Sequence, residues 1–120
     1  MATLLASVGA AQAAGDPQRG ARAFQKCYAC HALEPGIRNL QGPSLVKLWG
    51  RRAGTLPGFD FSDALVEAGA ARDLRWSETT LDGFLADPQR YVPGLGMGFF
   101  GLKDPDERAD LIAYLREATR

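Results

Sequence analysis

The chain has 120 residues, of which 46% are hydrophobic and 23% are charged, as expected for one globular domain. Its 14 basic and 14 acidic side chains cancel to a formal net charge of zero. Because nucleic-acid-binding domains usually carry a basic surplus, this balance argues against a nucleic-acid partner and leaves no strong net field to steer any other partner.

Residues 1–14 differ from the rest of the chain because they carry no charge. An apolar stretch over residues 4–11 ends in small residues that resemble a signal-peptidase site, although no Lys or Arg precedes it. The stretch is too short to span a bilayer, and an N-terminal tail is the alternative interpretation. We therefore expect residues 1–14 to be a signal-peptide remnant, cleaved near Ala13 or Ala14, and residues 15–120 to form an exported domain that does not span the membrane.

A first helix is expected over residues 17–26. Asp16 is a favourable N-cap, and Pro17 suits the first position of a helix. Gly20 and Phe24 are four residues apart and therefore share one face of this helix. The helix would deliver the most distinctive motif of the sequence at its end.

Cys27, Cys30 and His31 form a Cys-x-x-Cys-His motif, which is typical of c-type haem attachment. Two thiols at this spacing can each form a thioether to a porphyrin vinyl group, and the following imidazole can bind the iron. The chain contains two cysteines, one histidine and two methionines, and one methionine is the initiator Met1. Met97 is then the one thioether left for the opposite side of the iron, and His/Met ligation is the arrangement of electron-carrying cytochromes c.

Three other interpretations of the motif remain open at this point. A structural zinc ion needs four nitrogen or sulfur ligands, and this motif offers only three, crowded into residues 27–31. A thioredoxin-like dithiol needs a βαβ setting, which nothing downstream in the sequence indicates. An incidental match is the third alternative.

Residues 32–60 lack sustained periodicity and are rich in Gly and Pro, which predicts loops. Proline restricts φ, so the chain around Pro43 is expected to be extended, and its carbonyl could accept the second N–H of His31. A plain turn explains the same spacing equally well. A loop region of this length is unusual in a compact domain, unless it wraps a large apolar cofactor that supplies the missing core.

Two helices are expected in the middle of the chain. The first begins at Ser62 and stops near Gly69. The second begins after the N-cap Ser77 and ends at Asp87-Pro88. The apolar stripe of the second helix consists of Leu81, Phe84 and Leu85.

The last helix has the clearest pattern. It begins at the N-cap Asp104, with Pro105 at its first position and Glu107 placed as in a capping box. Apolar residues then recur at helical spacing, namely Leu111, Tyr114, Leu115 and Ala118. Because no segment carries a convincing strand pattern, the predicted fold is all-α.

The succession of motifs from residue 15 to residue 119 resembles the class I cytochromes c, of the bacterial and mitochondrial type. The motifs that carry the resemblance, beyond Gly20, Phe24 and Cys-x-x-Cys-His, are Gly42-Pro43-Ser44-Leu45, residues 50–54, Pro57-Gly58-Phe59, Trp76, Tyr91-Val92-Pro93-Gly94, Met97 and residues 110–115. The resemblance implies a cytochrome c fold, with helices and long loops wrapped around one haem c. It also implies that the haem is attached to Cys27 and Cys30, that His31 and Met97 are the axial ligands, and that the first and last helices cross near Gly20, Phe24, Leu111 and Tyr114.

The resemblance further places Arg51 and Trp76 beside a haem propionate. A guanidinium pairs well with a carboxylate, and an indole N–H is a donor on an apolar body. A solvated surface charge at Arg51 and simple core filling by Trp76 are the alternatives.

Several residues depart from the pattern of this family. Phe61 and Phe84 stand where the family usually has tyrosines that face the haem, and Leu65 stands where it usually has an amide. Leu95 and Gly96 stand where a threonine and a lysine are common. Several hydroxyl and amide donors are therefore expected to be absent from the haem pocket.

The segment around Met97 is expected to be loosely held. Glycine occupies three of the six positions from Pro93 to Gly98, and each glycine adds backbone freedom that folding must remove. We therefore predict that cyanide, imidazole or alkaline pH displaces Met97 more readily than in a typical relative.

The lysine-rich front face of the family is also reduced in this chain. Its three lysines are Lys26, Lys47 and Lys103, whereas residues 95–100 would form an apolar, uncharged lip near the haem edge. Docking to a redox partner is therefore expected to depend less on salt than in lysine-rich carriers.

These features favour a soluble, monomeric one-electron carrier in the periplasm, or otherwise exported, that serves redox partner proteins and is not an enzyme. One alternative is a dedicated subunit or donor of a single oxidoreductase. Another is weak peroxidase-like activity if Met97 dissociates, although no histidine remains to act as a distal base.

Overall fold

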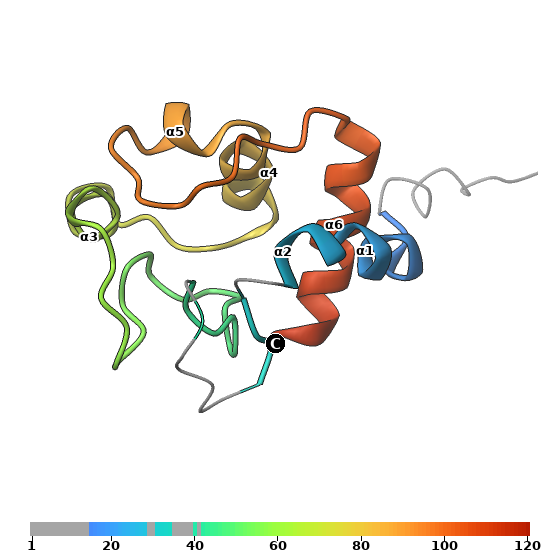
Figure 1. Cartoon of the computed structure of the whole chain (residues 1–120), viewed down its shortest axis with the longest axis horizontal. Coiled ribbons are helices and arrows are strands. Elements are labelled where there is room, and N and C mark those ends of the chain that lie inside the picture. Colours follow the sequence, from blue (N-terminus) through green and yellow to red (C-terminus); the bar gives the residue numbers. More distant parts are fainter. Residues whose placement is uncertain (1–14, 29–30, 35–39, 41) are drawn as a thin grey trace, which may run out of the picture.

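A computed structural model of the chain describes residues 15–28, 31–34, 40 and 42–120 (Figure 1). Its helices are α1 (Pro17–Ala23), α2 (Gln25–Tyr28), α3 (Asp63–Arg72), α4 (Glu78–Ala86), α5 (Pro88–Tyr91) and α6 (Pro105–Ala118). The described residues contain no strand, and their only β pairing is an isolated antiparallel bridge between Arg52 and Arg75. The all-α prediction is therefore confirmed. None of the described helices has the length and apolar character needed to cross a membrane.

The first helix begins as predicted but is interrupted before residue 26. The Asp16 side chain accepts a hydrogen bond from the Gln18 backbone N–H at 3.0 Å, and Pro17 lies in the first turn. At Phe24 the chain tightens, because the Cys27 N–H donates to the Phe24 carbonyl three residues back, at 2.8 Å. This tighter turn separates α1 from α2, so Cys27 lies in a second, short helix.

The predicted crossing of the first and last helices is present, with α1 packed across α6 (Figure 1). Gly20 is buried, and a Cβ at this position would overlap the carbonyl oxygen of Asp110 and lie 2.7 Å from the Tyr114 Cβ. Glycine is therefore what lets the two backbones approach. Beside this contact, the rings of Phe24 and Tyr114 are 5.7 Å apart, and Leu111 is only 1% exposed.

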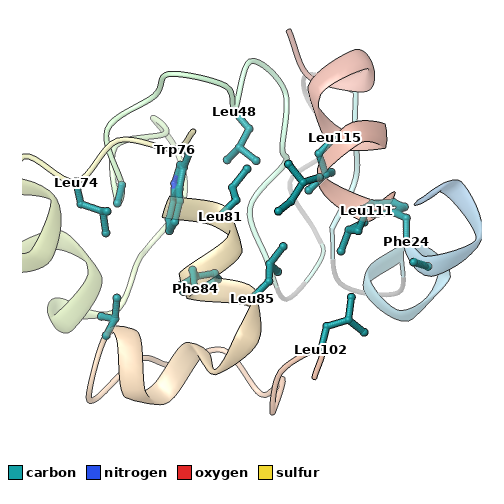
Figure 2. Close-up of a cluster of buried hydrophobic side chains, with 14 of the residues drawn as sticks. Phe24, Leu48, Leu74, Trp76, Leu81, Phe84, Leu85, Leu102, Leu111 and Leu115 are labelled. Carbon is teal, nitrogen blue, oxygen red and sulfur yellow. The ribbon is translucent and has the colours of Figure 1, made fainter. Parts of the chain in front are cut away.

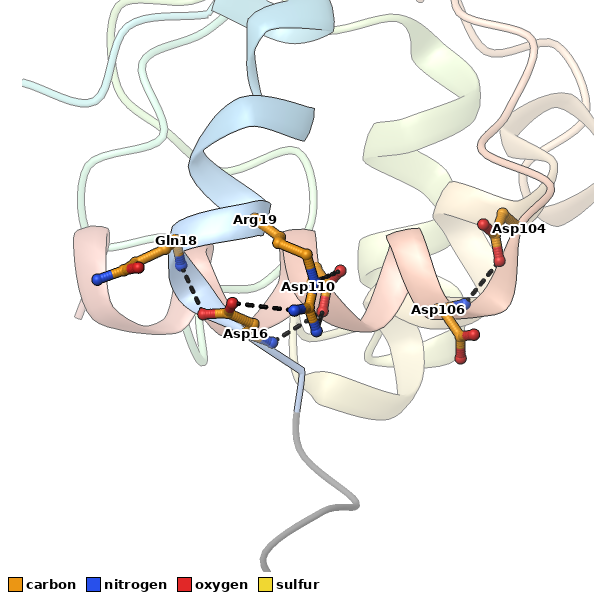
Figure 3. Close-up of polar contacts among 6 residues, drawn as sticks. All are labelled: Asp16, Gln18, Arg19, Asp104, Asp106 and Asp110. Carbon is orange, nitrogen blue, oxygen red and sulfur yellow. Dashed lines mark hydrogen bonds and ion pairs between the residues drawn. The ribbon is translucent and has the colours of Figure 1, made fainter.

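A buried carboxylate also joins the start of α1 to α6 (Figure 3). Asp110 accepts hydrogen bonds from the Asp16 backbone N–H at 2.8 Å and from the Arg19 Nε at 3.0 Å. The Asp110 side chain is 11% exposed, whereas the Arg19 side chain is 60% exposed. The hydrogen bond from Asp16, followed by that from Arg19, lowers the pKa of Asp110. No local sequence pattern marks this contact.

The helix α3 continues to Arg72, so the predicted stop near Gly69 is wrong. Gly69 serves a different purpose, because a Cβ there would overlap the carbonyl oxygen of Ala53. This glycine lets the loop region before α3 pack against the helix. The helix ends where Asp73 adopts a left-handed conformation, with φ of 48°.

The helix α4 matches its prediction closely. Ser77 and Thr80 form a reciprocal capping box, and the predicted stripe of Leu81, Phe84 and Leu85 is buried. Asp87-Pro88 ends this helix as expected. The same pair also starts the unpredicted helix α5, because the Asp87 side chain accepts a hydrogen bond from the Arg90 N–H at 3.3 Å.

The helix α6 begins after Asp104, whose side chain accepts from the Asp106 N–H at 3.0 Å. The expected capping box is absent, because Glu107 pairs with Lys26 at 2.9 Å instead of turning back to the N-cap. Ala118, which was expected on the apolar face, is exposed. The buried face is formed mainly by Leu111, Ile112 and Leu115. Figure 2 shows Leu111 and Leu115 on the same side of the core as Phe24, and the apolar residues of α4 opposite them.

Candidate functional site

A cavity of about 390 Å³ lies within this core. Its wall comes from α2, from the loops before α3, from α3 itself, from α4 and the segment before it, from the segment between α5 and α6, and from α6. The lining is mainly apolar and includes Leu45, Leu48, Phe59, Phe61, Leu65, Leu81, Phe84 and Leu115. A cavity of this size, with apolar walls and few polar groups, is typical of a site for an organic ligand or cofactor.

His31 is buried at this cavity, with 9% of its surface exposed. Its Nδ1 lies 2.9 Å from the carbonyl oxygen of Pro43, which can only accept, so Nδ1 carries the hydrogen. Burial lowers the pKa of His31 below its ordinary value of 6.5, and the hydrogen bond to Pro43 offsets this effect only in part. The imidazole is therefore neutral at pH 7, and its Nε2 lone pair is available to a metal.

The hydrogen bond predicted between His31 and Pro43 is thus present. A carbonyl in this position fixes the tautomer of a metal-ligating histidine, fixes its ring orientation and makes it more basic. The alternative, a plain turn without this contact, does not describe the structure.

Met97 reaches the same cavity from the segment between α5 and α6, and Cys27 reaches it from α2. Both side chains are half-buried. Cys30 lies outside the described residues. The structure therefore brings four of the predicted site residues, Cys27, His31, Pro43 and Met97, to one cavity.

Arg51 and Trp76 also line the cavity, and their backbones are linked because the Trp76 backbone N–H donates to the Arg51 carbonyl at 3.0 Å. The Arg51 guanidinium donates to the carbonyls of Val46 at 3.0 Å and Ser44 at 3.5 Å. No carboxylate among the described residues pairs with it, and burial lowers the pKa of Arg51. The site thus holds a half-buried cation that is not neutralised by this part of the chain.

Trp76 is only 6% exposed and packs edge-to-face against Phe84, with ring centroids 5.0 Å apart.

Phe61, Leu65 and Phe84, the residues that depart from the family's pattern, all line the cavity. The wall therefore lacks hydroxyl and amide donors at these three positions, as the sequence indicates. Leu95 also faces the cavity and is 8% exposed, so within the predicted apolar lip of residues 95–100 it lies in the cavity wall and not on the surface.

One residue beside the site, Gln89 of α5, was not predicted from the sequence. Its side-chain amide donates to the Leu95 carbonyl at 2.7 Å. Gln89 is an exposed residue in a four-residue helix, and no pattern in the sequence indicates that its side chain bonds to the backbone near Met97.

The residues present fit a covalently attached haem. The Cys-x-x-Cys-His motif begins at the cavity, a neutral imidazole and a thioether both line it, and a cation that could pair with a carboxylate lies at its wall. Neither a structural zinc ion nor a thioredoxin-like dithiol would need a large cavity with apolar walls beside the motif.

Comparison with known proteins also supports a haem-binding site. Residues 17–119 match the family model described as cytochrome c. Cytochrome c of Chlamydomonas reinhardtii is 50% identical over 107 residues, covering 88% of this chain and 92% of that protein. Cytochrome c2 of Rhodomicrobium vannielii is 45% identical over 105 residues, covering 88% and 81%.

The fold has a matching solved structure, that of cytochrome c2 from Rhodospirillum centenum. It superposes with a TM-score of 0.81 at 35% sequence identity, and the match covers 88% of this chain and 100% of that structure. Members of this family carry one covalently bound haem and are electron carriers rather than enzymes. With a family model that matches nearly all described residues, and with relatives of this identity, the chain belongs to the cytochrome c family, in its class I, monohaem branch.

Proposed function

We propose that this chain carries single electrons through a haem attached to Cys27 and Cys30, whose iron His31 and Met97 would bind. When bound, the haem supplies an iron that alternates between the ferrous and ferric states. The observation that carries the proposal is the neutral, buried His31, held by Pro43 in the same cavity that Met97 lines.

The chain's own residues then have distinct tasks. Pro43 orients the imidazole of His31 through the 2.9 Å hydrogen bond. The apolar wall, in which Phe84 and Trp76 pack together, excludes water from the site. The unneutralised guanidinium of Arg51 supports its assignment to a haem propionate, with Trp76 beside it.

The ligation is tested on the oxidised holoprotein by the weak thioether-to-iron charge-transfer band. We expect the band in the wild type and its loss in Met97→Ala. A Phe100→Ala variant serves as the control, because Phe100 is 84% exposed and does not line the cavity. A wild-type holoprotein without the band would contradict His/Met ligation.

Attachment is tested separately, by intact mass and by the reduced pyridine haemochrome spectrum. Cys27→Ala and Cys30→Ala should each leave a haem with one thioether, and their spectra should shift in the same direction. Protein that is matured with haem-attachment machinery but still weighs no more than its amino acids would contradict the proposal.

Export to the periplasm, with cleavage near Ala13 or Ala14, belongs to the same proposal. It is supported by the uncharged apolar stretch and the small residues within residues 1–14, which lie outside the described residues. The intact mass of protein from its native host is the test. A mature species that retains residues 1–14 would contradict cleavage.

Docking to redox partner proteins is proposed to rely little on lysine charges. Lys26 pairs with Glu107 at 2.9 Å, and the Lys103 ammonium lies 4.0 Å from the Asp87 carboxylate. These partners reduce the positive field that two of the three lysines could present. The ring of Phe100 is exposed and lies at the end of the segment that carries Met97. We propose that this ring makes an apolar contact with the redox partner.

A further inference from the structure

We propose that Gln89 is a positioning residue for Met97. Its side-chain amide holds the backbone of the ligand loop, which we define as residues 93–98, and thereby holds the Met97 sulfur at the cavity. The inference rests on the ligation of iron by Met97 proposed above. According to this inference, Gln89, which lies outside the cavity wall, determines how readily Met97 dissociates from the iron.

The contact consists of one donor shared by two carbonyls. The Gln89 Nε2 lies 2.7 Å from the Leu95 carbonyl oxygen and 3.4 Å from the Met97 carbonyl oxygen. The first distance is that of a good hydrogen bond, and the second is that of a longer, weaker one. The two carbonyls lie on either side of Gly96, so one amide restrains the loop across its middle glycine.

Gln89 extends from a firmly packed base. Pro88, the residue before it, is fully buried, and Val92 is 2% exposed and donates to the Pro88 carbonyl at 2.9 Å. The Tyr91 ring packs at 6.3 Å from that of Phe84 in the cavity wall. A donor on such a buried base can restrain the backbone of the ligand loop.

Leu95 is buried and donates to the Val92 carbonyl at 3.1 Å, but the part of the ligand loop after Leu95 has little else to hold it. In the described part of the chain, no hydrogen bond other than that from Gln89 reaches residues 96–101. A Cβ at Gly98 would meet nothing within 4 Å, and one at Gly96 would meet only the Ser62 Cβ, at 3.5 Å. Loss of the Gln89 contact would therefore release a segment with high backbone entropy.

The test uses the oxidised holoprotein and imidazole as the competing ligand for iron. Gln89→Glu keeps the shape of the side chain but replaces the donor with an acceptor that faces two carbonyl oxygens. Gln89→Arg restores an N–H, because its Nε is the same number of bonds from the backbone as the glutamine amide nitrogen. Gln18→Glu makes the same change at an exposed residue in the first turn of α1 and is the matched control.

Gln89→Glu is expected to raise the affinity for imidazole by between about twofold and tenfold, the range that corresponds to one net hydrogen bond. Gln89→Arg and Gln18→Glu should stay within about twofold of the wild type. Hydrogen–deuterium exchange gives a second readout that does not depend on electron transfer. The Leu95 amide, which donates to the Val92 carbonyl at 3.1 Å, should exchange faster in Gln89→Glu, while the amides of α6 should not change.

Three results would overturn the inference. In the first, Gln89→Glu changes neither imidazole affinity nor exchange of the Leu95 amide. In the second, exchange rises equally in α6, which means that Gln89 stabilises the whole fold and not the ligand loop. In the third, the wild type lacks the thioether band, and the proposed ligation then fails as well. Because the third result is seen without any variant, it is distinguishable from failure of the Gln89 proposal alone.

Discussion

The buried carboxylate of Asp110 allows a quantitative prediction about the contact between α1 and α6. Asp110→Asn keeps the size of the side chain but removes the charge that faces the Asp16 N–H at 2.8 Å. A hydrogen bond to a charged group contributes about 1.5–3 kcal/mol, and a bond between neutral groups contributes about 0.5–1.5 kcal/mol. The variant should therefore lose about 1–2 kcal/mol in the free energy of unfolding at pH 7. Arg19 adds little to this figure, because its side chain is 60% exposed.

The effect should also depend on pH in a defined direction. The folded-state pKa of Asp110 lies below its ordinary value of 3.8, first because of the hydrogen bond from Asp16 and then because of that from Arg19. The stabilisation by this carboxylate is therefore complete above the ordinary value, and it disappears as the pH falls through the lower folded value. The difference between wild type and variant should be constant from about pH 7 to about pH 5 and shrink below about pH 4.

Guanidinium unfolding of the oxidised holoprotein, followed by tryptophan fluorescence at each pH, measures this difference. Asp73→Asn is the matched control, because Asp73 is 65% exposed and its ion pairs with Arg52 and Arg75 are exposed too. The control should change stability by about 0.5 kcal/mol or less. An Asp110→Asn effect as small as that of the control, or one that persists undiminished to about pH 2, would refute the reasoning.

Four further outcomes are expected. Gly98→Ala should raise the free energy of unfolding by about 0.4–1 kcal/mol and weaken imidazole binding, because the added Cβ meets no protein atom within 4 Å and the unfolded chain loses freedom; denaturant unfolding and imidazole titration measure this. Gly20→Ala should lower stability by about 1–3 kcal/mol in the same unfolding assay, because its Cβ would overlap α6. Electron exchange with a redox partner should slow only slightly as ionic strength rises, because Lys26 and Lys103 lie beside carboxylates; a steep fall would contradict this. In an alkaline titration, the charge-transfer band of Met97 should disappear at a lower pH than in a lysine-rich relative, and a band that persists to strongly alkaline pH would show a tightly held loop.

Local chemistry explains where sequence reasoning succeeded. The caps at Asp16, Ser77 and Asp104 were predictable, because an N-cap depends on hydrogen bonds within the first turn of its own helix. The His31–Pro43 contact was foreseen as one of two options, because proline restricts the local backbone and the spacing is short. The Cys-x-x-Cys-His motif and the single remaining thioether then indicated the chemistry of the site.

The failures share a different cause, which is contact between distant parts of the chain. Glu107 has a capping-box position in the sequence, but Lys26 from α2 draws it away. Gly69 resembles a helix stop in the sequence, but in the structure it lies within α3, where the absence of a side chain leaves space for the Ala53 carbonyl. The contact of Gln89 with the Leu95 carbonyl depends on how α5 folds against the following segment, which no local pattern encodes.

One helix, α6, is shared by two separate parts of the molecule. Asp110 and Tyr114 contact α1, while Leu111 and Leu115 on the same helix form part of the cavity wall. Detachment of α1 would therefore leave the cavity wall without its support. The helices α1 and α6, together with the part of the cavity wall that Leu111 and Leu115 form, should consequently unfold as a single cooperative unit, and unfolding of α1 in the holoprotein should alter the visible spectrum in step with helix loss.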